Sequence, residues 1–386
     1  MNKLSKVVEG LKPSGIRKFF DLVMGMDDVI SLGVGEPDFA TPWHIREAAI
    51  KSIEDGFTNY TSNKGMPRLR SALTNHLREK HYLKYDPEEE ILITTGVSEG
   101  MDLAMRALLN PGDEVIVPTP CYVSYLPTVL MPGGKVVTVN TGTDGSFKLK
   151  PEQLEKAITK KTKILALNYP CNPTGVTYNE EELKKIAEVV QKHDLIVLSD
   201  EIYGHLTYED FHTPFPVLPG MKERTVYLNG FSKNCAMTGM RIAYACGPQK
   251  IIGAMTKIHQ YTMLSSPTTS QFAALEAVLG GERSIKTMRD EYERRRDLVV
   301  RRFHEMNIPC PYPQGAFYAF PSLENIRLDP EEFCTRLLKE QKVAVVPGSA
   351  FGPGGERHIR VSYATGYEKL SEALNKIETF LDKLRS

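Results

Sequence analysis

Short apolar blocks and helix-like segments follow one another along the central part of the chain. In residues 180–193, apolar side chains recur at helical spacing, at Leu183, Ile186, Val189 and Val190. The intervening runs are apolar at nearly every position, which is typical of strands in a mostly parallel sheet that helices cover on both faces. The predicted strands are Glu90–Gly96, Glu114–Pro118, Lys135–Val139, Lys163–Leu167, Leu195–Leu198, Thr225–Leu228 and Ile242–Ala245. The pattern therefore predicts an α/β fold.

The pattern changes beyond about residue 285. A long charged helix, Arg289–Met306, is followed by three short runs and by a final helix that ends near Leu384. The runs are Gly315–Phe320, Val343–Val346 and His358–Tyr363. Shorter and more mixed elements of this kind predict a smaller α+β domain. We expect the charge run Arg294–Arg302 to be a solvated helix face. The predicted parts are residues 1–40, an arm and loop folded back over the site, residues 41–285, the large α/β domain, and residues 286–386, the small domain.

The charge balance and the cysteines narrow the class of protein. Lys+Arg and Asp+Glu number 48 each, so there is no long-range attraction to nucleic acid or to an anionic membrane. The six cysteines form no CxxC pair, which is typical of reduced thiols in a cytoplasmic protein. No stretch reaches the roughly 20 apolar residues of a membrane span. The nine histidines lack ligand spacing, so we expect no metal.

Polar side chains stand at the ends of several predicted strands, where open α/β sheets bind ligands. Ser98 begins a helix directly after Thr95 and Gly96, and free N–H groups at a helix N-terminus bind anions. Asn172 lies between Pro170 and Pro173 in a stiff turn. Taken alone, each has a simpler structural interpretation: a helix cap for Ser98 and a turn residue for Asn172.

Two further strand ends carry an acid and an amine. Asp200 ends an apolar strand, where a carboxylate needs a cationic or hydrogen-bonding partner, and a structural ion pair explains it equally well. Lys233 follows the strand Thr225–Leu228, and Arg241 eight residues later would lower the pKa of a nearby amine. A surface lysine is the alternative. One ligand accounts for all four strand ends, because pyridoxal phosphate needs an anion cradle, a carboxylate for its ring nitrogen, donors for its phenolate and a lysine for its aldehyde.

Three motifs carry a resemblance to a known family. SKNCAMTGMR at Ser232–Arg241, with PCNPTG at Pro170–Gly175 and SDEIY at Ser199–Tyr203, resembles the class I/II aminotransferases of the pyridoxal-phosphate (PLP) fold type I. The resemblance extends from Leu32–Phe39 to Ile359–Tyr363. It implies that Lys233 forms a Schiff base with pyridoxal 5'-phosphate and then moves the substrate proton. It also implies that Asp200 pairs with the pyridinium nitrogen.

The resemblance assigns further roles. Asn172 and Tyr203 are expected to bind the ring oxygen of the cofactor, Tyr122 to stack on its ring, and Arg360 and Gly35 to hold and cover the substrate, to which Asn172 also contributes. The expected phosphate ligands are Val97, Ser98, Arg241 and Tyr60, the last from the partner subunit of a homodimer with shared sites. Many family members have Ser where this chain has Gly230, so one phosphate contact is missing or comes from Ser232 or the backbone.

The implied reaction is transfer of an amino group from an L-amino acid to a 2-oxo acid by a ping-pong mechanism. The expected acceptor is 2-oxoglutarate. The donor is aromatic, aspartate-like or of diaminopimelate type. Arg106 is either a cation for a distal carboxylate or a helix-surface residue; Ser14–Arg17 is expected to border the same pocket, and Tyr125 and Phe351 to favour aromatic rings. Two alternatives stay open. One is a PLP-dependent β-lyase on the same fold. The other is a PLP-binding regulator without turnover; such regulators usually carry an added DNA-binding domain, and residues 1–30 are too short for one.

Overall fold

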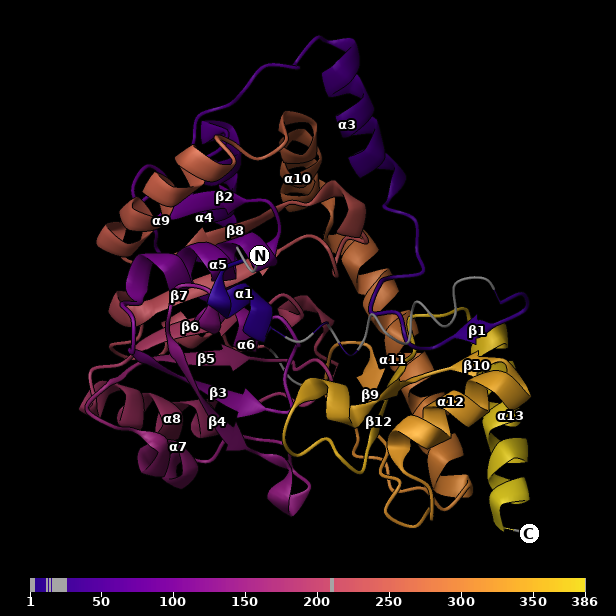
Figure 1. Ribbon diagram of the computed structural model, residues 1–386. Helices are drawn as coiled ribbons and strands as arrows, with labels where there is room; N and C mark the ends of the chain where they lie inside the picture. Colours follow the sequence, from indigo (N-terminus) through magenta and orange to yellow (C-terminus); the bar gives the residue numbers. More distant parts are fainter. Residues whose placement is uncertain (1–3, 12, 14, 16–25, 209–211, 386) are drawn as a thin grey trace.

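A seven-stranded sheet forms the centre of the computed structural model, which describes residues 4–385 except 12, 14, 16–25 and 209–211 (Figure 1). Its strands, in chain order, are β2 (Ile91–Thr94), β3 (Glu114–Thr119), β4 (Lys135–Asn140), β5 (Thr162–Asn168), β6 (Ile196–Asp200), β7 (Thr225–Gly230) and β8 (Ala243–Cys246). The spatial order is β2-β8-β7-β6-β5-β3-β4. Strand β8 is antiparallel to both neighbours and the other adjacent pairs are parallel. The predicted mostly parallel sheet is confirmed, with strand ends shifted by a few residues.

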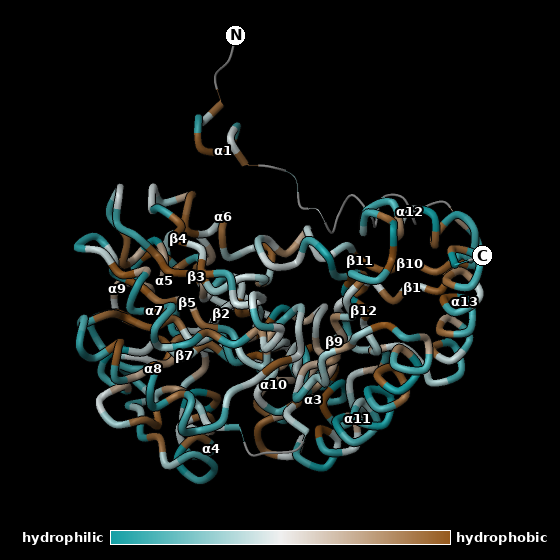
Figure 2. Tube along the Cα trace, turned by 90° about the horizontal axis from the view of Figure 1, so that it is seen from below, coloured by the Kyte–Doolittle hydropathy of each residue, from teal (hydrophilic) through white to brown (hydrophobic). Residues whose placement is uncertain are grey.

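Both faces of the sheet are buried, as the continuous apolar strands indicated. Along β5, Ile164 and Ala166 join one hydrophobic cluster while Leu165 and Leu167 join another on the opposite face. The first face is covered by α5 (Val97–Leu108), α6 (Tyr125–Leu130) and α9 (Gln249–Thr262), and the second by α7 (Pro151–Ala157) and α8 (Glu180–Lys192). In Figure 2 the strands are mainly hydrophobic and the outer helices mainly hydrophilic. The carboxyl ends of the parallel strands β3, β5, β6 and β7 therefore lie along one edge of a sheet that is buried on both faces.

A smaller α+β unit packs beside this sheet (Figure 1). It contains α11 (Glu282–Glu305), α12 (Pro330–Gln341) and α13 (Tyr367–Arg385), and the antiparallel strands β11 (Val346–Pro347), β12 (Ile359–Ser362) and β9 (Tyr318–Ala319). Strand β1 (Ile30–Ser31) pairs in parallel with β10 (Val343–Ala344), and Leu32 is buried in the cluster of the small unit. A short N-terminal strand thus belongs to this unit by its hydrogen bonds.

The expected solvated face of the charge run on α11 is wrong for two of its residues. Arg295 and Arg296 are only 4% and 2% exposed. Arg295 binds both carboxylate oxygens of Asp38 at 2.8 and 2.9 Å, and its guanidinium stacks over Phe39. A buried arginine needs such partners, and this one comes from a segment 257 residues away in the chain.

The remaining helices complete the molecule. Helices α3 (Trp43–Glu54), α4 (Pro67–His81) and α10 (Thr268–Gly280) cover the β2 end, and α1 (Lys6–Gly10) has no buried residue. The short 3₁₀ helices are η1 (Gly142–Asp144), η2 (Gly204–Leu206), η3 (Phe215–Val217), η4 (Lys222–Arg224), η5 (Thr238–Met240) and η6 (Gly348–Phe351). None of the described helices is long and apolar enough to cross a membrane.

Candidate active site

Lys233 follows β7 at the carboxyl edge of the sheet. Its Nζ donates a hydrogen bond to the carbonyl oxygen of Gly35 at 2.8 Å. The pKa of this amine is lowered to about 8, mainly by burial, with Arg360 and Arg241 also lowering it and Glu36 and Asp200 opposing them. An amine with a pKa near 8 is partly neutral at physiological pH, and the neutral form is the nucleophile.

Asp200 ends β6, the strand next to β7, and is 4% exposed. Its Oδ2 accepts a hydrogen bond from the Tyr125 hydroxyl at 2.6 Å, and its Oδ1 accepts one from the Ile202 N–H at 3.1 Å. Burial raises the pKa of the carboxyl to about 6, against the lowering effect of these two donors. Among the described residues its hydrogen-bond partners are a phenol and a backbone amide, so no cation holds it in a structural ion pair. A cation delivered to this position would stabilise the carboxylate.

The turn between β2 and α5 brings Arg241 to a helix N-terminus. Gly96 has φ +83°, and a Cβ at this residue would lie 2.6 Å from Nη2 of Arg241. Only glycine therefore lets the guanidinium approach the turn. The N–H groups of Val97 and Ser98, at the start of α5, have no partner within the helix, and the hydroxyl of Thr95 is buried without a protein partner. The predicted anion cradle has its cation and its free donors in one place.

Arg360, on β12 of the small unit, is 2% exposed. Its Nη1 donates to Oδ1 of Asn172 at 2.8 Å and its Nη2 donates to the carbonyl of Gly33 at 2.5 Å. Its Nε is buried without a partner, and the guanidinium lies 4.6 and 4.8 Å from the ring centres of Tyr318 and Phe351. These hydrogen-bond acceptors are all neutral, and burial lowers the pKa of the guanidinium. A buried cation with neutral partners is suited to bind an incoming carboxylate.

Sequence reasoning missed Tyr318, which lies against three of the expected site residues, Tyr203, Arg360 and Gly35. Its hydroxyl lies 2.8 Å from the hydroxyl of Tyr203, and burial raises the pKa of Tyr203 well above its usual range. A Cβ at Gly35 would clash with the same hydroxyl, so Gly35 permits the loop to approach Tyr318. The run Gly315–Phe320 was visible in the sequence, but nothing in it indicated which of its aromatic side chains faces the site.

Three side chains that were considered for substrate selection have protein contacts of their own. Tyr125 was expected to favour aromatic substrates, yet its hydroxyl binds Asp200 and its ring packs edge-on against Tyr122, with 5.8 Å between the ring centres. Arg106 is 45% exposed and pairs with Asp102 one turn earlier on α5, at 2.9 Å. The structure therefore favours the helix-surface interpretation of Arg106. Phe351, also expected near aromatic substrates, packs against the Arg360 guanidinium.

The remaining residues that the sequence assigned to the site are Tyr60, Ser232 and the segment from Ser14 to Arg17. Tyr60 is 80% exposed, on a segment beside α10, where the Asn59 carbonyl accepts a hydrogen bond from Thr268. Ser232 is buried next to Lys233. Ser14, Ile16 and Arg17 lie outside the described residues. Nowhere in the described part of the chain do three His, Cys, Asp or Glu side chains gather as a metal site would require.

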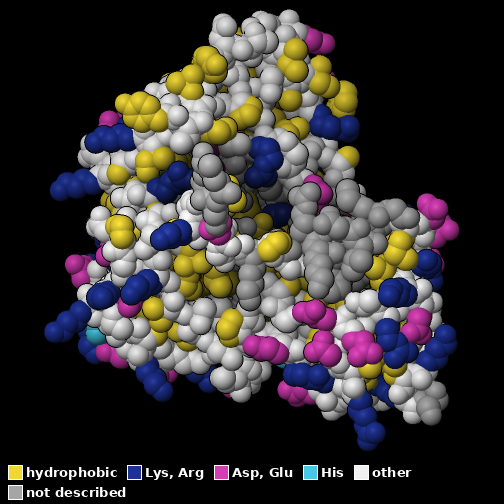
Figure 3. Space-filling model, viewed as in Figure 1, with side chains coloured by type: hydrophobic (Ala, Val, Ile, Leu, Met, Phe, Trp, Pro, Cys, Tyr) yellow, Lys and Arg dark blue, Asp and Glu magenta, His cyan; other side chains and the backbone are white. Residues whose placement is uncertain are grey.

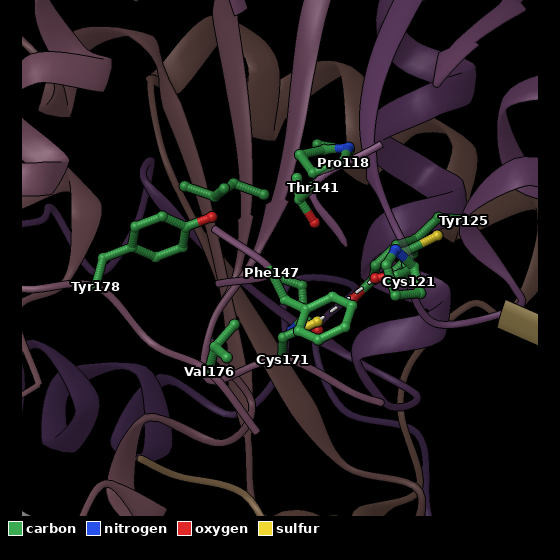
Figure 4. Close-up of a pocket in the computed structure, with 12 residues that line it drawn as sticks. Pro118, Cys121, Tyr125, Thr141, Phe147, Cys171, Val176 and Tyr178 are labelled. Atoms are coloured by element: carbon green, nitrogen blue, oxygen red, sulfur yellow. Dashed lines mark hydrogen bonds between the residues drawn. The ribbon is translucent and has the colours of Figure 1, made fainter. Parts of the chain in front are cut away.

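A small cavity lies beside the strand ends (Figure 4). Tyr125, Cys121, Phe147, Cys171 and Tyr178 line it with seven others, and its volume of about 20 Å³ gives room for about one water. It is too small for a cofactor or an amino acid.

The fold and these side chains define a class of enzyme: one that presents a buried, partly neutral lysine, a carboxylate, an anion cradle and an arginine for a carboxylate at the edge of one sheet. Comparison with known proteins agrees with this description. The model of the family "Aminotransferase class I and II" matches residues 27–377. The chain belongs to this family, and it is an enzyme of the transaminase class.

Individual relatives match over nearly the whole length. An aspartate aminotransferase of Pyrococcus abyssi is 46% identical over 382 residues, 98% of each chain, and aromatic-amino-acid aminotransferase 2 of Thermococcus litoralis is 43% identical with the same coverage. Among solved structures, aspartate aminotransferase from Thermus thermophilus with maleate has a TM-score of 0.93 at 38% identity, covering 98% of this chain and 100% of that one. The fold is that of PLP fold type I.

Proposed function

We propose that this protein is a pyridoxal 5'-phosphate-dependent aminotransferase that transfers the amino group of an L-amino acid to a 2-oxo acid, with 2-oxoglutarate as acceptor, by a ping-pong mechanism. One observation carries the proposal: the amine of Lys233, whose pKa is lowered by burial and by two arginines, lies at the same sheet edge as Asp200. Nucleophilic lysines of carbonyl chemistry need such surroundings.

The residues fit the cofactor. Arg241 and the free N–H groups of Val97 and Ser98 would hold its phosphate, helped by the unpartnered hydroxyl of Thr95. Asp200 has no cationic hydrogen-bond partner of its own among the described residues, which suits a protonated ring nitrogen. Asn172 and Tyr203 would bind the ring oxygen, Tyr122 would stack on the ring, and Ser232 is close enough in sequence to supply the phosphate contact that Gly230 lacks. When bound, pyridoxal phosphate supplies the electron sink for the reaction at the substrate Cα.

The chain itself supplies the attachment point, the base and the clamp. Lys233 carries the cofactor and, once substrate frees its amine, accepts the proton from the substrate Cα; a positioned base of this kind contributes about 10²–10⁴-fold. Arg360 holds the α-carboxylate through a charge-assisted pair, exchanging part of its hydrogen bonding to Asn172 and Gly33. Gly35 lies over the amine and excludes water from it.

The donor is aromatic, aspartate-like or of diaminopimelate type. Support comes from relatives whose names include aspartate, aromatic-amino-acid and N-acetyl-LL-diaminopimelate aminotransferases at 40–46% identity. We further propose that residues 1–40, 41–285 and 286–386 act as arm, cofactor domain and small domain, because Arg360 of the third part bonds to Gly33 of the first and Asn172 of the second. The six free cysteines agree with a cytoplasmic location.

The functional unit in this proposal is a homodimer with shared sites. Large apolar side chains are exposed over α3, α9, α10 and the nearby segments, where Figure 3 shows hydrophobic side chains gathered at the upper end of the molecule. They are Trp43, Ile50, Ile53, Phe57, Tyr60, Tyr261, Met263, Leu264 and Leu279. Large apolar side chains exposed in one region of the surface are typical of a subunit interface. Tyr60 lies within it and is therefore free to reach the phosphate of the partner subunit.

The test combines a colour change with product analysis. Purified protein is mixed with pyridoxal phosphate, reduced with borohydride and mapped for the modified residue, which we expect to be Lys233. A panel of aromatic, acidic and diaminopimelate-type donors is then assayed with 2-oxoglutarate. Glutamate formation supports transamination, whereas pyruvate and ammonia without a 2-oxo acid would indicate a lyase. A protein that stays colourless with the cofactor would refute the proposal.

A further inference from the structure

A buried acid–imidazole pair lies directly behind the turn that forms the anion cradle. Glu99, in the first turn of α5, accepts a hydrogen bond from the Thr95 N–H at 2.5 Å through Oε2. Its Oε1 lies 2.7 Å from Nδ1 of His259 on α9. The side chains of Glu99 and His259 are 13% and 0% exposed, so water gives them little screening.

The same histidine is tied to the segment that carries Tyr60. The backbone carbonyl of His259 accepts hydrogen bonds from the N–H groups of Met263 and Leu264, at 2.8 and 3.0 Å, where α9 ends. The carbonyl of Leu264 in turn accepts a hydrogen bond from Asn63 Nδ2 at 2.7 Å. Asn63 lies three residues after Tyr60. A continuous series of contacts therefore runs from the Thr95 turn to the exposed Tyr60 segment.

The negative charge of Glu99 is close to the anion cradle, and His259 reduces its effect there. By binding the Thr95 N–H, the carboxylate fixes the turn and leaves the N–H groups of Val97 and Ser98 to face the cradle. A carboxylate one turn from a bound phosphate would repel it, and it is too buried for solvent to screen the repulsion. The imidazole on its far side provides a hydrogen-bond donor that holds the carboxylate back and offsets its charge.

We propose that Glu99 and His259 are positioning residues for the cofactor phosphate, and that through Leu264 and Asn63 the same contacts also set the Tyr60 segment that serves the partner subunit. This inference rests on the proposed function, since it requires a phosphate in the cradle. One pair of side chains then adjusts both halves of a composite anion site: the cradle of its own subunit and the tyrosine offered to the other.

The experiment compares the affinities of the apoprotein for pyridoxal phosphate and for pyridoxal, which lacks the phosphate. His259→Leu leaves Glu99 without its donor, so we expect the Kd for pyridoxal phosphate to rise about tenfold with little change for pyridoxal. His259→Asn keeps a donor near the position of Nδ1 and should bind nearly as the wild type does. Adding Glu99→Gln to His259→Leu removes the repelling charge and should restore much of the affinity, also giving a second variant if the single one folds poorly.

The link to the Tyr60 segment is tested with Asn63→Ala. We expect this variant to weaken pyridoxal phosphate binding selectively. Its effect and that of His259→Leu should be less than additive, because losing the Glu99 contact loosens the end of α9 whose backbone carbonyl holds Leu264, and Asn63→Ala breaks the next contact of the same series. His193→Leu breaks a similar pair with Glu155 at 2.8 Å, between α7 and the end of α8, and should leave the ratio of the two affinities unchanged.

The outcomes separate the two proposals. If the wild type binds neither ligand, the proposed function falls and this inference with it. If the wild type prefers pyridoxal phosphate but His259→Leu loses affinity for both ligands equally, or for neither, only the positioning role is refuted. Fully additive losses for Asn63→Ala and His259→Leu would refute the link to the Tyr60 segment.

Discussion

Arg360 and Asn172, 188 residues apart in the chain, are joined by a 2.8 Å hydrogen bond between Nη1 and Oδ1. The bond connects the small unit to the end of β5, and the same guanidinium reaches Gly33 of the N-terminal segment. Three separate stretches of sequence thus converge on one buried cation whose acceptors are neutral. The site is complete only when the small unit is docked against the sheet, so substrate binding and domain position are connected.

Replacing Lys233 tests the attachment point. We expect Lys233→Ala to abolish transamination and the borohydride-fixed cofactor adduct together, because no other described amine is placed at the end of β7. Absorbance of the cofactor-loaded protein and glutamate formation measure the two effects. Arg106→Ala, at an exposed position on α5, is the matched control and should retain both. Full activity in Lys233→Ala would contradict the assignment.

Replacing Arg360 tests the carboxylate clamp. Arg360→Ala should raise KM for every amino donor by about 10–100-fold, since hydrogen bonds to charged groups are each worth about 1.5–3 kcal/mol. The loss should be similar across donors, because all share the α-carboxylate. Steady-state kinetics with one aromatic and one acidic donor distinguish this from a side-chain role, which would show as a loss for one donor alone.

The buried carboxyl of Asp200 should reduce the stability of the apoprotein at neutral pH. Its folded-state pKa of about 6 lies above the ordinary 3.8, so the stability that protonation contributes is present below pH 4 and is lost as the pH rises through 6. Asp200→Asn should therefore raise the free energy of unfolding of the apoprotein at pH 8 by up to about 3 kcal/mol while abolishing catalysis. Urea unfolding at pH 4 and pH 8 measures this; an equal effect at both values would contradict it.

Tyr125→Phe tests the hydroxyl that supports Asp200. The hydroxyl donates to the carboxylate at 2.6 Å and lowers its pKa, so its removal should raise that pKa further. We expect the acidic limb of the kcat/KM profile to move to higher pH, with little change at the alkaline limb. A profile that moves to lower pH would show that the phenol does not stabilise the charged carboxylate.

Gly230 occupies a position where the family resemblance leads us to expect serine, and its packing leaves no room for a side chain. A Cβ at Gly230 would lie 2.6 Å from the Cβ of Ala243 on the adjacent strand β8. Gly230→Ser should therefore destabilise the protein by about 1–3 kcal/mol, the usual cost of overpacking, and Ala243→Gly should restore part of the loss. Gly253→Ser on α9 is the control, because nothing lies within 4 Å of a Cβ added there. Thermal unfolding of Gly230→Ser, of Gly230→Ser with Ala243→Gly, and of Gly253→Ser measures the three stabilities; equal losses for Gly230→Ser and Gly253→Ser would contradict the packing explanation.

The sequence predicted the elements well and the side-chain partners less well, for a physical reason. A continuous apolar run such as Ile164–Leu167 predicts a strand that is buried on both faces, so strands and layers can be predicted from local pattern. The partner of Arg295 or of Tyr125 depends on segments far apart in sequence, which no local period encodes. The buried Arg295–Asp38 pair and the Tyr125–Asp200 hydrogen bond were missed for that reason.

The pairing of β1 with β10 has a mechanical consequence. Because Ile30 and Ser31 are hydrogen-bonded to Val343 and Ala344, the chain just before Gly35 travels with the small unit rather than with the central sheet. Rotation of that unit would draw the Gly35 carbonyl away from the Lys233 amine, which remains on the sheet. The contact between the lysine and this carbonyl oxygen therefore depends on where the two-residue strand β1, and with it the small unit, is positioned.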